Sequence, residues 1–98
     1  DGIGTNPEEL IGAAHAGCFT MKLSFLLGAE GFTPDLLETD AGVTYEDGSV
    51  SNIHLNLVGK VAGISEAQFT EIAQKAKVEC PISKLLNTNI TLDIKLAE

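Results

Sequence analysis

The chain has 98 residues and a formal net charge of −8, with six lysines, no arginine and fourteen acidic residues. Such an acidic chain lacks the basic surface by which proteins bind nucleic acid or anionic lipid, so we expect neither partner. A hydrophobic fraction of 44% with only 5% aromatic residues predicts one folded domain over residues 1–98 with an aliphatic core.

A long helix is predicted near the start of the chain. The segment Thr5–Pro7 offers a Thr/Asn cap followed by proline at the first helical position. The acids Glu8 and Glu9 then lie at the positive end of the helix dipole. The helical pattern runs to about Ala29, and Gly31 is the expected stop. Because this segment is apolar on nearly all sides, we expect a buried central helix.

Three strands and two shorter helices are predicted after it. Alternating apolar residues indicate strands around 53–61 and 90–96, and a strand over 38–45 turns back through Asp47-Gly48. The segment Ser65–Gln68 resembles a capping box, which begins a helix that ends before Cys80. Pro81 begins a short helix to about Leu86. We therefore expect an α+β fold in the order α-β-β-α-α-β, with a long central helix and an antiparallel sheet that carries the helices on one face.

The predicted strands are too few for the predicted helix. Three strands cannot cover a long buried helix on all sides, so we expect either further strands upstream of Asp1 or a second copy of the chain. A chain of this size is also near the lower limit at which a single core stabilises itself. Both considerations favour a homodimer.

The location of the chain is predicted from its hydropathy pattern. There is no charged segment followed by a short apolar one, as in a signal peptide, so we expect the cytoplasm. Lys22 and small polar residues interrupt the most apolar segment, so we expect no membrane span.

Cys18 and Cys80 are the only cysteines and the best candidates for chemistry. Two thiols far apart in the sequence are a poor structural staple but a good redox couple if the fold brings them together. Cys18 lies about three turns into the first helix, too far for its N-terminus to lower the thiol pKa, so Lys22 at i+4 is the nearest cation. Cys80 precedes Pro81 at a helix start, where free N–H groups stabilise a thiolate, so Cys80 is predicted to be the more activated thiol.

Other interpretations of these residues stay open. Cys18 could be a small apolar core residue, and Cys80 a cap without reactivity. His15 could form a metal site with Cys18 and either Glu8 or Cys80, but the spacing is weak evidence for zinc, so no metal or cofactor is predicted. Glu8 is an ordinary first-turn acid that lies roughly 15 Å from Cys18 along the helix, too far for contact within one chain.

Three segments carry motifs in order: Gly4–Leu10, Ala13–Phe19 with His-Ala-Gly-Cys-Phe, and Ala76–Lys84 with Cys-Pro-Ile-Ser-Lys. These motifs resemble those of the OsmC/Ohr family of thiol peroxidases, and the OsmC branch more than the Ohr branch. The resemblance implies an intertwined homodimer in which long central helices are wrapped by sheets, and an enzyme that reduces organic hydroperoxides with an external dithiol. It also implies that Cys18 is the peroxidatic cysteine, that Cys80 is the resolving cysteine forming a disulfide with it, and that Glu8 holds a catalytic arginine.

The sequence departs from this family at its start. The family's arginine lies on a strand upstream of the Thr-Asn-Pro-Glu motif, so the resemblance implies an N-terminal β region before Asp1. Without that region Lys22 would have to replace the arginine, and a point charge is a poor substitute for a guanidinium group. The alternative function is a catalytically inactive relative that acts as a dimeric binding module for small apolar ligands.

Overall fold

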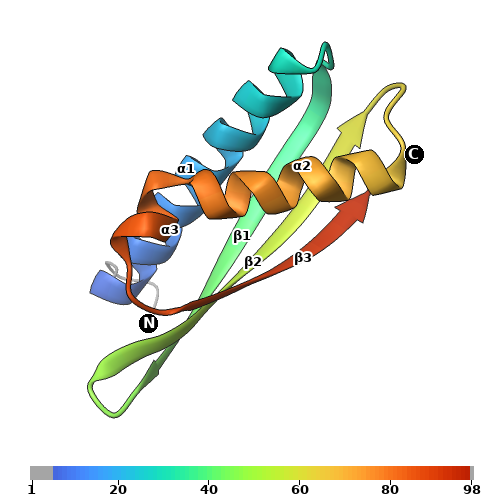
Figure 1. The fold of residues 1–98 in the computed structure, drawn as a ribbon. Coiled ribbons are helices and arrows are strands. Elements are labelled where there is room, and N and C mark those ends of the chain that lie inside the picture. The colour runs from blue at the N-terminus through green and yellow to red at the C-terminus, as the bar shows by residue number, and fades with distance from the viewer. Residues whose placement is uncertain (1–5, 98) are drawn as a thin grey trace.

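The structure is a computed structural model that describes residues 6–97 of the chain. The described elements follow the predicted order α-β-β-α-α-β (Figure 1). They are α1 (Pro7–Ala29), β1 (Pro34–Glu46), β2 (Ser49–Val61), α2 (Glu66–Glu79), α3 (Pro81–Leu85) and β3 (Asn89–Leu96).

Both ends of α1 follow from local sequence signals. The Asn6 side chain accepts a hydrogen bond from the backbone N–H of Glu9 at 2.8 Å, which satisfies one free donor of the first turn. Past the other end, Gly31 has a φ of 89°, a conformation that glycine adopts without a Cβ penalty. The predicted cap at Asn6 and the predicted stop are confirmed, whereas Thr5 lies outside the described residues.

The three strands form one mixed sheet in the order β1-β2-β3. β1 and β2 are antiparallel and are joined by a tight turn at Asp47 and Gly48, whose φ values are 52° and 80°. β3 runs parallel to β2, so the expectation of a purely antiparallel sheet was wrong for this strand. The reason is the connection, because α2 and α3 form a crossover that returns the chain in the direction of β2.

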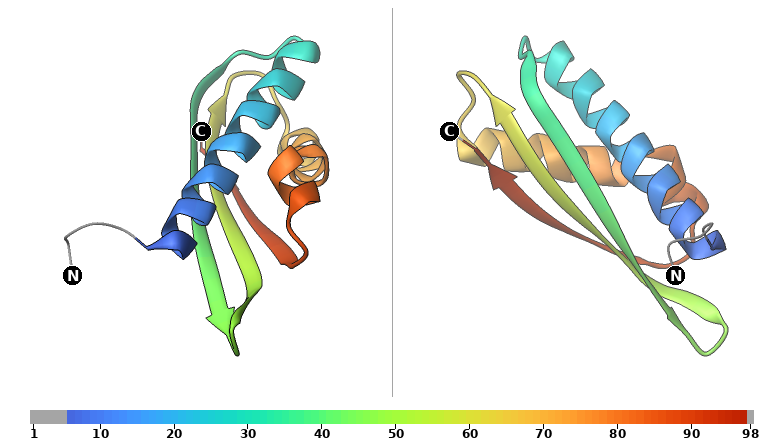
Figure 2. Two further views of the ribbon diagram at one scale, coloured as in Figure 1. Left: turned by 90° about the vertical axis from the view of Figure 1, so that its left-hand side faces the viewer. Right: turned by 180° about the vertical axis from the view of Figure 1, so that it is seen from behind.

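The helices lie on one face of the sheet, and the core lies between (Figure 2). β2 supplies the centre of this core through the predicted alternation, since its inward residues from Ile53 to Val61 are buried. α1 contributes one side of the core and α2 covers the other. The largest fully buried apolar side chains are Phe19, Phe69, Leu23, Leu27, Ile53, Leu55 and Leu57.

Gly59 is required by the way α2 packs on β2. A Cβ built at Gly59 would overlap the edge of the Phe69 ring, with its Cε1 atom at 3.1 Å, and would lie 3.3 Å from Leu37 Cδ2. The aromatic ring thus fills the space that a side chain at this inward strand position would occupy. A glycine in the middle of a buried strand marks such a close approach.

α1 is buried on one side only within the described chain, which differs from the expectation of a helix buried all round. Its inward residues include Phe19 and Leu23, whereas Met21 and Phe25 are 75% and 69% exposed. α1 is also long enough, and with a mean hydropathy of 1.4 apolar enough, to cross a membrane. The presence of Lys22 therefore does not by itself exclude a membrane span, contrary to the expectation from the sequence. Core helices of water-soluble proteins meet the same criteria.

Candidate active site

The fold brings the two cysteines into contact. Cys18 lies on the side of α1 that faces the junction of α2 and α3, and Cys80 is the residue at which α2 ends and α3 begins. The two sulfur atoms are 2.9 Å apart, and both residues are free thiols. Cys80 is fully buried and Cys18 is half-buried, so the Cys18 sulfur is the more accessible of the two.

A backbone donor of α3 also reaches the Cys18 sulfur. Pro81 opens α3 and has no N–H, so the first free donor of the helix belongs to Ile82. This N–H acts on the Cys18 sulfur in the direction that lowers its pKa, whereas the Cys80 side chain makes no capping hydrogen bond with its own helix. The free N–H groups of this turn were expected to stabilise a Cys80 thiolate, whereas the Ile82 N–H acts on Cys18 instead.

The Cys18 thiol has a raised pKa in the described chain. Burial raises the pKa most, and the hydrogen bond with Cys80 raises it further. The Ile82 N–H and the Lys22 ammonium act in the opposite direction, because both stabilise the thiolate, but they do not outweigh the burial. Cys18 is therefore mainly protonated near neutral pH in this environment.

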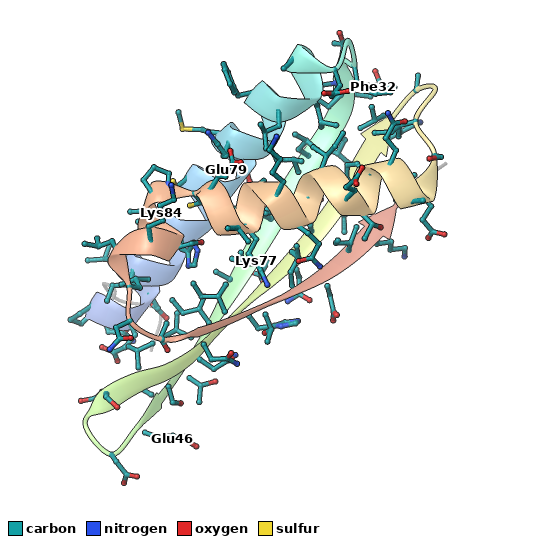
Figure 3. All side chains as sticks on the ribbon, viewed as in Figure 1. Phe32, Glu46, Lys77, Glu79 and Lys84 are labelled. Carbon is teal, nitrogen blue, oxygen red and sulfur yellow. The ribbon has the colours of Figure 1, made fainter. Side chains whose placement is uncertain are left out.

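Lys22 lies one turn after Cys18, as predicted, and forms an ion pair that the sequence pattern did not predict. Its Nζ atom is 3.5 Å from Oε1 of Glu79 and 5.6 Å from the centroid of the Phe25 ring. Glu79 ends α2, immediately before Cys80, where α2 meets α1 (Figure 3). One signal in the sequence could have indicated this ion pair. Glu79 is an acid in the last turn of a helix, where the helix dipole disfavours negative charge, so a nearby cation was to be expected.

His15 is bound to a neighbour on α3 rather than paired with Cys18. It is fully buried, and its Nε2 atom lies 2.8 Å from the Ser83 hydroxyl oxygen. Burial lowers the pKa of His15, which favours the neutral ring. Within residues 6–97, no three histidine, cysteine or acidic side chains are grouped closely enough to hold a metal ion. The open interpretation of His15 as a metal ligand thus gains no support.

Glu8 is not brought to the thiols within one chain. It lies half-buried in the first turn of α1 and does not line the groove beside Cys18. Within residues 6–97 the Glu8 side chain forms no hydrogen bond or ion pair. This placement agrees with the predicted separation of Glu8 from Cys18, and the role of Glu8 stays a prediction.

An open groove of about 700 Å³ leads to the Cys18 sulfur. Its walls are mostly apolar side chains and small residues of α1, and Lys22 is the charged residue that lines it. A groove of this kind admits an apolar molecule to the thiol while leaving a cation nearby. The larger side chains that line it are Met21, Lys22, Phe25, Pro81 and Ile82.

The raised pKa of Cys18 predicts a pH dependence. In the folded protein, the rate of Cys18 alkylation should rise with pH through the usual thiol range and level off only above it. The free energy of unfolding should fall over the same interval, because the charged form is disfavoured in the folded state. Peptide-resolved mass spectrometry of iodoacetamide labelling measures the rate, with urea-unfolded protein as the control. A midpoint at or below that of the unfolded chain would contradict this prediction.

Comparisons with known proteins agree with these observations. The family model described as OsmC-like protein matches residues 1–95. Peroxiredoxin OsmC of Escherichia coli (strain K12) is 48% identical over 97 residues, covering 95% of this chain and 68% of that protein. Organic hydroperoxide resistance protein OhrA of Bacillus subtilis is 29% identical over 102 residues, covering 96% and 68%.

Solved structures share the fold. The crystal structure of an OsmC-like protein from Mycoplasma pneumoniae superposes with a TM-score of 0.87 at 16% identity, covering 97% of this chain and 74% of that one. The organic hydroperoxide resistance protein OhrB of Bacillus subtilis gives a TM-score of 0.67 at 27% identity, covering 96% and 71%. The motifs, the paired thiols, the fold and these matches lead to one conclusion: the chain belongs to the OsmC-like family.

Proposed function

We propose that this chain is a thiol-dependent peroxidase that reduces organic hydroperoxides to alcohols in defence against oxidative stress. The observation that carries the proposal is the contact of the Cys18 and Cys80 sulfurs, 2.9 Å apart, at the end of an apolar groove. The names of the relatives, which include a peroxiredoxin and hydroperoxide resistance proteins, support the same class of reaction.

Cys18 acts as the nucleophile in this proposal, because Cys18 lines the groove whereas Cys80 is fully buried and does not line it. The Cys18 thiolate attacks the terminal oxygen of the hydroperoxide, and the O–O bond breaks. The terminal oxygen stays on sulfur with its hydrogen, which gives a sulfenic acid, and the alkoxide takes a proton from solvent to become the alcohol. The sulfur has lost two electrons and the peroxide has gained them.

Cys80 resolves the oxidised cysteine. Its sulfur needs only a small movement to reach bonding distance of Cys18, since the two already touch. Attack of Cys80 on the sulfenic acid forms the disulfide and releases the hydroxyl group with a proton as water. An external dithiol then reduces the disulfide by two exchange steps and is itself oxidised.

The groove supports the proposed substrate class. Its apolar walls favour alkyl or aryl hydroperoxides over hydrogen peroxide, which offers no apolar surface to bury.

The proposed working form is a homodimer in the cytoplasm. Residues of α1 such as Met21 and Phe25 are apolar and exposed, which suits a second subunit that buries them. Across such an interface, Glu8 of the partner subunit is proposed to hold a cationic side chain near Cys18. That cation would offset the burial that raises the pKa of this thiol.

The proposal is tested by adding one equivalent of cumene hydroperoxide to the reduced protein and measuring its intact mass and peptide map. We expect rapid loss of two hydrogens and a cross-linked peptide that joins Cys18 to Cys80. Thiols that stay reduced would contradict the proposal. If the protein then bound an apolar fluorescent probe equally well before and after Cys18→Ser, the binding-module alternative, which would use the same groove, would be favoured.

A further inference from the structure

An ion pair lies directly beside the two thiols. Lys22 follows Cys18 by one turn on α1, and Glu79 immediately precedes Cys80 at the end of α2. The Nζ atom of Lys22 and the Oε1 atom of Glu79 are 3.5 Å apart. Each thiol therefore has a member of this ion pair close to it along its own part of the chain. Among the described residues, Lys22 is the cation whose charge acts on the Cys18 sulfur.

Helix stability does not explain an acid at position 79. A negative charge in the last turn of a helix is disfavoured by the helix dipole, and Glu79 is the last residue of α2. The basic residue of that turn, Lys77, donates to the backbone carbonyl of Ile90 on β3 and is directed away from the thiols. The described contact of Glu79 is therefore with Lys22 on the other helix.

We propose that Glu79 is a positioning residue, which competes with the Cys18 sulfur for the Lys22 ammonium and so sets the fraction of Cys18 present as thiolate. With Cys18 protonated, Glu79 is the anion available to Lys22, and the structure has Lys22 paired with Glu79. When Cys18 ionises, its thiolate becomes a second anion one helical turn from the same ammonium. The more strongly Glu79 binds the Lys22 ammonium, the less that ammonium stabilises the Cys18 thiolate.

The size of the effect is set by exposure. The side chains of Lys22 and Glu79 are 29% and 36% exposed, so solvent screens the interaction in part. We expect removal of either charge to shift the Cys18 titration by about half a pH unit, or roughly threefold in thiolate fraction. The shifts have opposite signs: loss of Glu79 favours the thiolate, and loss of Lys22 disfavours it.

Other charged groups near Cys18 do not offer the same competition. On α1, His15 is held neutral by burial and bonded to Ser83. β1 packs against α1, and its acids Glu38 and Asp40 are exposed. On α2, Lys77 is half-buried and bonded to Ile90, and the other titratable groups besides Glu79, namely Glu66, Glu71 and Lys75, are exposed. Cys80 lies at the junction of α2 and α3, and Lys84 on α3 is exposed.

The test uses the full chain with Cys80→Ser, so that Cys18 is the thiol observed. The ultraviolet absorbance of the thiolate and the rate of iodoacetamide alkylation are followed against pH. Glu79→Gln should lower the midpoint by about half a unit and raise the rate at neutral pH roughly threefold, and Glu79→Asp should restore much of the original midpoint. Lys22→Met should raise the midpoint by a similar amount. In the Lys22→Met background, Glu79→Gln should have no further effect.

Glu71→Gln is the matched control. It removes one negative charge from the exposed side of the same helix, about 12 Å along the axis from Glu79. It should leave the midpoint unchanged. The inference is overturned if Glu79→Gln leaves the midpoint unchanged, or if it lowers the midpoint equally in the Lys22→Met background.

This inference rests on the proposed function only for its effect on turnover. The titration and the alkylation need no peroxide, so they measure the competition for Lys22 even in a protein without peroxidase activity. Shifted midpoints without peroxide consumption would overturn the proposed function and support the role of Glu79. Peroxide consumption with midpoints that do not respond to Glu79 would do the reverse.

Discussion

Replacing Cys18 by serine is expected to abolish peroxide reduction, with a rate loss on the order of a thousandfold or more. Serine keeps nearly the same shape beside Ile82 and Cys80, but its hydroxyl does not ionise near neutral pH and is a far weaker nucleophile than a thiolate. The measurement is the consumption of cumene hydroperoxide by the reduced protein with an excess of dithiothreitol.

Cys80→Ser is the informative counterpart of that variant. It leaves the Cys18 sulfur in the groove, so the first equivalent of hydroperoxide should still be consumed. Without a thiol at position 80, Cys18 should stop as the sulfenic acid and pass to the sulfinic acid in excess peroxide, which intact mass detects as added oxygen. If Cys80→Ser lost the first turnover as completely as Cys18→Ser, the proposed division of roles would be wrong.

Gly59→Ala is expected to lower the free energy of unfolding by about 2–3 kcal/mol, a large effect for one methyl group. The new Cβ would overlap the Phe69 ring, and both residues are buried between β2 and α2. The ring is rigid and fully enclosed, so relief requires a shift of α2 away from the sheet. Urea denaturation followed by circular dichroism gives the change in free energy.

A double-mutant cycle with Phe69 isolates this contact. Phe69→Leu alone should cost about 1–2 kcal/mol through lost burial, and together with Gly59→Ala it should cost less than the sum, because a smaller side chain leaves room for the methyl group. Gly28→Ala is the control, since a Cβ there has open space around it in a helix, and alanine should be neutral or stabilising by up to about 1 kcal/mol. Strict additivity of the two core changes would contradict the proposed clash.

The sequence predicts the elements because their signals are local. The Asn6 cap, the Gly31 stop and the Ser65 cap each depend on neighbours within four residues, and each is found where it was expected. The inward face of β2 is also local, because alternation along one strand determines which residues share a side. β1 begins at Pro34, four residues before its predicted start, so the strand end was less well defined than its centre.

What the sequence could not predict depends on contacts between distant segments. The direction of β3 is decided by the path through α2 and α3, which strand alternation does not reveal. The Lys22–Glu79 ion pair and the Ile82 N–H at the Cys18 sulfur need α1 to lie against the α2–α3 junction, and no pattern within either segment specifies that contact. The apolar composition of α1 likewise did not show which of its sides would be covered within one subunit.

The two thiols also lie at the ends of a long chain segment. They are 62 positions apart, and β1, β2 and α2 lie between them. In the proposed cycle the disulfide would close that loop, which the chain-entropy model values at about 4 kcal/mol relative to the open unfolded chain. Each oxidation would then make the molecule harder to unfold, and each reduction would release that constraint. When the reductant is exhausted, the protein would therefore accumulate in the disulfide form, which is the form most stable against unfolding.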